Sequence, residues 1–129
     1  MIPKFRAWDK KKERMIEWID LDFSKDNGED FIIVFEPTGI VRDAIISPIL
    51  LQSTGLFDRN GKEIYEGDIV KHDPVPNPFI SNAYFEIIQA RSGEWRMDNY
   101  RGGQVLAYGN HEVEVVGNKF EHPHLLEEE

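Results

Sequence analysis

The segment Asp58-Arg59-Asn60-Gly61 resembles part of a calcium-binding loop, because oxygen-bearing side chains precede a glycine. If Gly61 took the sixth position of such a loop, Leu56 would take the first position and Gly67 the twelfth. Both positions require side-chain oxygen ligands, which leucine and glycine do not have. We therefore interpret the segment as a β-turn, for which Asp, Asn and Gly are preferred.

The C-terminal end holds the residues that would be needed for a transition-metal site. His122-Pro123-His124 offers two imidazoles and residues 127–129 offer three carboxylates. Zinc requires three or four converging ligands on a rigid frame, and a chain end is a poor frame. His72 and His111 fall at a predicted strand end and in a turn, where surface or capping roles are usual. We expect no metal and no cofactor.

The sequence contains no assembled set of catalytic residues. It has no cysteine, no nucleophile elbow and no glycine-rich phosphate loop of the required spacing. The carboxylate pairs Asp20/Asp22 and Glu112/Glu114 have an i, i+2 spacing, which places each pair on one face of a strand. Such a face is typical of the solvated side of a half-buried sheet. We expect a protein without enzymatic activity and without catalytic residues.

Arginine and aromatic residues flank a pair of glycines at 102–103. Small barrels often bind ligands through such loops, by stacking and ionic contacts. The alternative is that Trp95 fills the core and Arg101 keeps a loop soluble. The candidate binding surface consists of Trp95, Arg96, Tyr100 and Arg101, with Trp8 and Trp18 as the second choice.

Short apolar segments separated by turn signals predict a mainly β protein, with α+β as the alternative. Residues 4–8 and 15–23 are expected to form a hairpin, and the apolar run 31–35 another strand. Residues 43–52 contain Pro48 and are expected to form a short helical turn or an irregular segment. Five further strands are predicted at 64–72, 84–90, 94–98, 104–108 and 112–116.

The five C-terminal strands, with a long proline-containing loop after the first, resemble a small SH3-like β-barrel. We expect an N-terminal β-hairpin region, residues 1–56, packed on this barrel, residues 57–129. One compact unit formed by both regions is the alternative.

Charge is unevenly distributed along the chain. The net charge is −9, which opposes nonspecific attraction to nucleic acid and anionic membranes. Residues 1–14 contain six Lys or Arg and two acidic residues, a net of +4, so the remainder carries −13. This segment is interpreted as a solvated hairpin tip, with an anion-contacting patch or half of a head-to-tail interface as alternatives. No signal peptide and no apolar run of membrane-spanning length is visible, so a cytoplasmic protein is expected.

Three segments together resemble the YopX family of small bacteriophage and prophage proteins. They are Phe5-Arg6-Ala7-Trp8-Asp9, the stretch from Gln52 to Val70, and the stretch from Val113 to Pro123. Lys119-Phe120 departs from the more apolar pair expected there, and Ser53 is smaller than usual. The resemblance implies a phage or prophage origin, a bacterial host cell and a β-rich fold, and it implies no catalytic residues.

Three functions remain open. The first is a non-enzymatic accessory protein that binds a protein partner, which could be a second copy of the chain. The second is nucleic-acid binding through the basic hairpin 1–14 and the loop 95–101, with salt-dependent affinity. The third is an acidic DNA mimic that inhibits a host enzyme through the carboxylates of 17–30 and 112–129.

Overall fold

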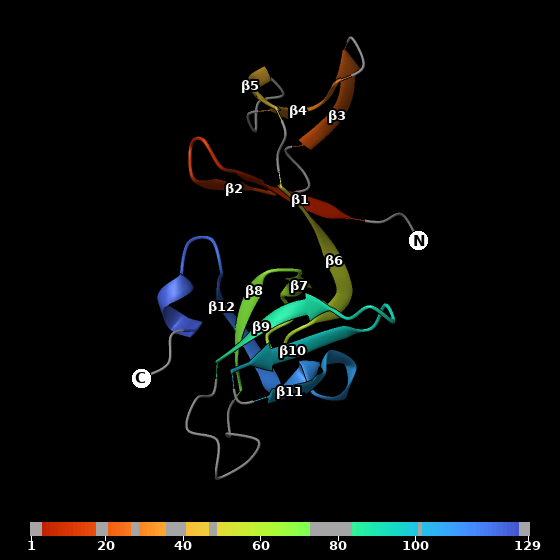
Figure 1. Cartoon of the computed structure of the whole chain (residues 1–129), viewed down its shortest axis with the longest axis vertical. Coiled ribbons are helices and arrows are strands. Elements are labelled where there is room, and N and C mark those ends of the chain that lie inside the picture. Colours follow the sequence, from red (N-terminus) through yellow and green to blue (C-terminus); the bar gives the residue numbers. More distant parts are fainter. Residues whose placement is uncertain are drawn as a thin grey trace. The chain divides into compact units, whose positions relative to one another are not determined.

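The computed structural model describes residues 4–17, 21–26, 29–35, 41–46, 49–72, 84–100 and 102–126. The chain divides into two compact units, Met1–Gln52 and Ser53–Glu129, whereas the sequence placed the boundary between residues 56 and 57. Antiparallel strands dominate both units, and the helices among the described residues are short 3-10 turns (Figure 1). The predicted mainly β class is confirmed.

The first unit contains the expected N-terminal hairpin. Strand β1 (Phe5–Asp9) pairs antiparallel with β2 (Arg14–Ile16), and Trp8 lies opposite Met15. On its other side β1 pairs with the start of β6 (Ile49–Phe57). Four consecutive residues of β1, from Arg6 to Asp9, are buried, and because neighbouring residues of a strand point to opposite faces, both faces of β1 are covered. The buried hydrophobic residues here are Ala7, Trp8, Ile16 and Leu51.

A second sheet of the first unit is formed by β3 (Leu21–Asp26), β4 (Glu29–Phe35) and β5 (Val41–Ile46), in that order. The helical or irregular segment expected at 43–52 is wrong, because β5 and β6 occupy it. The β-branched residues that end β5 favour extended backbone, and Pro48 falls between the two strands. The single strand expected at 15–23 is also wrong in its extent, because β2 ends at Ile16 and β3 begins at Leu21.

The second unit is built on a five-stranded antiparallel sheet that curls into a half-barrel (Figure 1). Its order is β11-β10-β9-β8-β12, and β7 pairs separately with β6. The strands are β7 (Glu63–Tyr65), β8 (Asp68–His72), β9 (Tyr84–Gln89), β10 (Trp95–Asn99), β11 (Gly102–Val105) and β12 (Val113–Asn118). The SH3-like assignment stays a prediction.

The core of the second unit lies on the concave face of this sheet. In β9, Phe85 and Ile87 are buried and alternate with Glu86 and Ile88, which are partly exposed. Each large apolar side chain buried in this way contributes about 1.5–3 kcal/mol of transfer free energy. The alternation leaves Glu86 and Ile88 on the outer face of the sheet. The buried cluster comprises Ile64, Val70, Phe85, Ile87, Met97, Leu106 and Val113.

The strand predicted at 104–108 is shorter than expected and begins earlier. Strand β11 ends at Val105, and Leu106–Tyr108 forms the 3-10 turn η2, closed by the Gly109 N–H on the Leu106 carbonyl at 3.0 Å. Leu106 is completely buried, so the chain turns where this side chain enters the core. A second turn, η3 (Asn110–Glu112), leads into β12, and η4 (Pro123–Leu126) follows it. Most of the loop expected at 72–78 lies outside the described residues.

Candidate functional site

The carboxylate of Asp58, in the segment that resembles a calcium loop, is committed to backbone hydrogen bonds. Its Oδ1 accepts from the N–H groups of Asn60 (2.8 Å) and Lys62 (2.9 Å), and its Oδ2 accepts from the N–H of Val115 (2.9 Å). The Gly61 N–H donates to the Asp58 carbonyl at 3.0 Å, which closes a β-turn. The carboxylate therefore ties this turn to β12.

Asp68 plays a similar part in the turn between β7 and β8. It is buried, and its Oδ2 accepts a hydrogen bond from the Tyr65 N–H at 2.8 Å. Gly67 has a φ of 83°, a conformation that side chains disfavour. Its N–H donates to the Ile87 carbonyl and its carbonyl accepts from the Lys119 N–H, both at 2.9 Å. The turn is thus held between β9 and the end of β12, which gives the sequence Tyr65–Asp68 a structural role.

The His-Pro-His segment near the C-terminus belongs to a hydrogen-bonded cap at the end of β12. The Asn118 N–H donates to Nδ1 of His122 at 3.2 Å, and the Asn118 side-chain oxygen accepts from the N–H groups of Phe120 (3.1 Å) and Glu121 (2.9 Å). The His122 and His124 rings lie edge to face with centroids 6.3 Å apart. Within the described ranges, no three His or carboxylate side chains are grouped so that they could hold a metal ion.

His72 and Glu112 form a hydrogen-bonded imidazole–carboxylate contact in the second unit. His72 is buried in β8, and its Nε2 lies 3.0 Å from Oε2 of the exposed Glu112 in η3. Such a contact supplies two groups of an acid–base site, but nucleophilic catalysis also needs a nucleophile placed beside the base. The pair joins β8 to η3.

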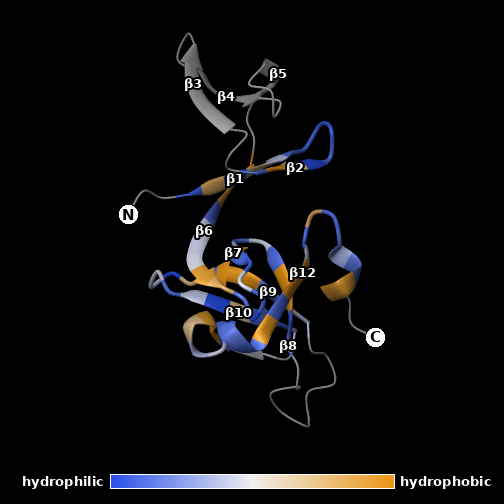
Figure 2. Cartoon of the chain, turned by 180° about the vertical axis from the view of Figure 1, so that it is seen from behind, coloured by the Kyte–Doolittle hydropathy of each residue, from blue (hydrophilic) through white to orange (hydrophobic). Residues whose placement is uncertain are grey.

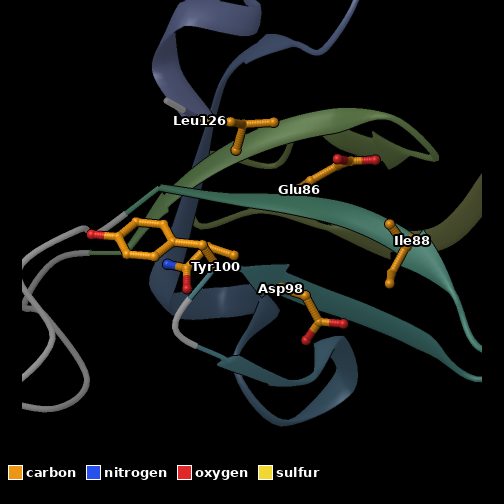
Figure 3. A pocket seen from close by; sticks show the side chains of 6 residues that line it. Glu86, Ile88, Asp98, Tyr100 and Leu126 are labelled. Atoms are coloured by element: carbon orange, nitrogen blue, oxygen red, sulfur yellow. The ribbon is translucent and has the colours of Figure 1, made fainter. Parts of the chain in front are cut away.

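A pocket of about 270 Å³ lies on the outer face of β9 and β10, where η4 approaches the sheet. The register pairs Asp98 with Glu86 and Arg96 with Ile88, so these four side chains share one face. Figure 3 shows the pocket side chains of β9 and β10, with Leu126 reaching toward them from η4. Its lining comprises Glu86, Ile88, Asp98, Asn99, Tyr100 and Leu126.

The pocket combines two carboxylates with apolar walls. Arg96 contacts Asp98 through Nε (3.2 Å) and a terminal nitrogen (3.1 Å), and this carboxylate raises the pKa of the Arg96 guanidinium. Lys119 contacts a single oxygen of Glu86, with its Nζ 3.5 Å from Oε2. Both oxygens of Asp98 are therefore engaged by Arg96. The Glu86 carboxylate contacts Lys119 through one oxygen and could bind a second cation.

Tyr100 supplies the exposed aromatic surface of the pocket. Solvent can reach 46% of the surface of this residue, which is a high fraction for a large aromatic residue. The preceding residue, Asn99, is anchored by a hydrogen bond from its Nδ2 to the Tyr84 carbonyl at 3.0 Å. The backbone that carries Tyr100 is thus tied to β9, while part of the ring stays accessible to a ligand.

The structure separates the residues proposed from sequence as one binding surface. Tyr100 lines the pocket, and Arg96 lies beside it through Asp98. Trp95 packs against the buried core of the second unit, and Trp8 is only 7% exposed in the first unit. Arg101 and Trp18 lie outside the described residues.

Sequence reasoning missed five of the lining residues: Glu86, Ile88, Asp98, Asn99 and Leu126. A usable signal existed for the strand residues, because the turn Ser92-Gly93 fixes the register of β9 and β10. The Gly93 N–H donates to the Ala90 carbonyl at 2.9 Å in the observed hairpin. Leu126 had no such local signal, since it reaches the pocket through a tertiary contact.

No helix among the described residues has the length and apolarity needed to cross a membrane. A comparison with curated proteins finds no significant match. The crystal structure of protein EF1440 from Enterococcus faecalis is similar to this chain, with a TM-score of 0.71 and 29% sequence identity. The similarity covers 98% of this chain and 99% of that one. A family model described as YopX protein matches residues 4–127, and since this is nearly the whole sequence, the chain belongs to the YopX family.

Proposed function

We propose that this chain is a non-enzymatic protein-interaction module whose docking site is the outer-face pocket of β9 and β10. The single observation that supports this most is the exposed Tyr100 ring beside two carboxylates, Glu86 and Asp98, in one pocket. Tyrosine is among the residues most often found as anchors of protein interfaces, and Tyr100 lies in the turn that directly follows β10. The phage or prophage setting and the host cytoplasm rest on the family resemblance.

The chemistry of the lining defines the kind of segment that would bind. Carboxylates recognise ammonium and guanidinium groups, and aromatic and aliphatic side chains pack on the methylene stems of lysine and arginine. Glu86 supplies the carboxylate with remaining capacity, because Lys119 touches only one of its oxygens at 3.5 Å. A short extended segment with one basic residue and a neighbouring apolar residue would match this lining.

A displayed library of random peptides tests the proposal, because it samples many combinations of basic and apolar residues. Selection on the native chain should enrich peptides that pair Lys or Arg with an apolar neighbour. The same peptides should lose binding to a chain carrying Tyr100→Ala and Glu86→Gln. A matched control is Gln89→Ala, which changes an exposed residue on β9 that does not line the pocket. No enrichment, or enrichment that survives the pocket substitutions, would reject the proposal.

A further inference from the structure

We propose that the outer-face pocket receives the basic β1–β2 turn of a second copy of this chain, so that copies associate head to tail. This inference rests on the proposed function, because it names the occupant of the same pocket. It is carried by the arrangement of charge in the turn, by the lining of the pocket and by the charge of the unit that contains it.

The β1–β2 turn presents three exposed lysines and the exposed Glu13, while Asp9 at its start is buried. Lys10, Lys11 and Lys12 are exposed, and the segment is strongly hydrophilic in Figure 2. Asp9 is buried, and its Oδ1 accepts from the N–H groups of Lys11 (3.0 Å) and Lys12 (3.3 Å). The Nε of Arg14 lies 3.5 Å from Oδ2 of Asp9. Because the Asp9 carboxylate is used within the hairpin, the tip 10–13 exposes three ammonium groups against the single carboxylate of Glu13, a net of +2.

The pocket offers what a lysine side chain requires. The Glu86 carboxylate can accept an ammonium group in addition to Lys119, and Asp98, which is paired with Arg96, lies opposite it in the neighbouring strand. Tyr100, Ile88 and Leu126 supply apolar surface for the methylene stem. A hairpin tip is narrow and carries its side chains on a fixed turn, so it can enter an open pocket with little ordering cost.

The charge of the two surfaces favours a second copy over an acidic or neutral partner. Residues 53–129 contain fourteen Asp and Glu and seven Lys and Arg, a net of −7. Residues 1–14 carry +4, and this is where the chain concentrates basic charge. Opposite net charges on segment 1–14 and on the second unit as a whole would steer the encounter of two copies and orient it.

The turn and the pocket are different surfaces, so the contact is heterologous. Heterologous contacts propagate into closed rings or open chains of subunits. A contact limited to one hairpin tip and one pocket is small, and it should be weak, dependent on concentration and reduced by salt.

Two variants that each lose one surface provide the test. The turn variant carries Lys10→Glu and Lys11→Glu, and the pocket variant carries Glu86→Gln and Tyr100→Ala. A control variant with Lys62→Glu and Lys71→Glu reverses two exposed lysines elsewhere. Sedimentation velocity would follow each full-length chain over a concentration series in low salt. Thermal unfolding would verify that every variant is folded.

We expect the native chain and the control variant to associate as concentration rises, and each single-surface variant to weaken association roughly tenfold or more. An equimolar mixture of the turn and pocket variants should form one-to-one dimers that do not grow, because each pair retains one complete contact. A native chain that stays monomeric, or variants that do not complement each other, would overturn the inference. Low-salt DNA binding lost in the turn variant, without self-association, would also overturn it in favour of a nucleic-acid contact.

The display selection separates this failure from failure of the proposed function. If the pocket binds displayed basic peptides but the chain does not self-associate, the pocket is a docking site for another protein and only the inference about a second copy fails. If neither binding is observed, both fail.

Discussion

The Oδ2 of Asp58 accepts a hydrogen bond from the backbone N–H of Val115 at 2.9 Å, which joins the turn after β6 to the edge strand β12. The Arg59 N–H donates to the Val113 carbonyl at 2.9 Å beside it, so this edge of the five-stranded sheet is covered. A residue from the most turn-like segment of the sequence therefore ties a loop to the edge strand of the half-barrel.

Replacing Asp58 with alanine should strongly destabilise the second unit. The substitution leaves three backbone N–H groups without their acceptor, and we expect a loss of about 3 kcal/mol in the free energy of unfolding. Urea denaturation measures this loss. Lys62→Ala, an exposed change in the same turn, should stay within about 0.5 kcal/mol of the native chain. Equal effects from the two substitutions would contradict the role given to Asp58.

We expect position 117 to require glycine, because the His122 ring leaves no room for a Cβ there. A Cβ at Gly117 would lie 2.5 Å from Nδ1 and 2.8 Å from Cγ of that ring, so Gly117→Ala must displace the C-terminal cap. We expect a loss of about 1–3 kcal/mol from overpacking. Since the clash is with a side chain, adding Gly117→Ala to a His122→Ala chain should cost much less. A double-mutant cycle by denaturation measures this coupling, and additive effects would refute the explanation.

Gly103 should behave differently, because its closest neighbours include backbone. A Cβ there would lie 1.8 Å from Oδ1 of Asp98 but also 2.1 Å from the Met97 carbonyl oxygen. Gly103→Ala should cost about 2–3 kcal/mol by forcing β10 and β11 apart. Asp98→Ala should not rescue it, because the contact with the Met97 carbonyl remains. Full rescue would show that the side chain alone sets the requirement for glycine.

The Ser92 hydroxyl should control the titration of Glu94 at the tip of the β9–β10 hairpin. Its hydrogen bond to Oε2 of Glu94 lowers the pKa of that carboxyl below the ordinary 4.5. A lowered carboxyl pKa stabilises the folded chain above the unfolded pKa, and this contribution is lost as pH falls through the folded value. Ser92→Ala should raise the Glu94 pKa in an NMR carboxyl titration. An unchanged pKa would exclude the hydroxyl as the cause.

Local chemistry allowed part of this fold to be predicted. The turns at Asn60-Gly61 and Ser92-Gly93 follow from residues that accept turn geometry, and both are present. Segment 43–52 was misassigned because spacings of three and four residues suggest a helix in a short apolar run, where strand and helix are hard to distinguish.

The candidate site was harder to predict from sequence, because its residues come together only through the pairing register of two strands. Tyr100 was chosen for its type and its loop position, whereas Glu86 and Asp98 meet only once β9 and β10 are aligned. Trp95 is two residues from the buried Met97 in β10. Because alternate residues of a strand point to the same face, Trp95 also faces the core. Leu126 enters the pocket through tertiary packing of η4, which no local pattern encodes.

The most direct test of the proposed docking site is an amide NMR titration of the labelled full-length chain with a peptide selected by display. We predict that the largest shifts occur at Ile88, Asn99, Tyr100 and Leu126, and that Tyr100→Ala abolishes them. Phe57 and Tyr108 provide the comparison, because they are exposed aromatics of the same unit (49% and 77%) that do not line the pocket. Shifts centred on Phe57 and Tyr108, with Tyr100 unaffected, would contradict the account.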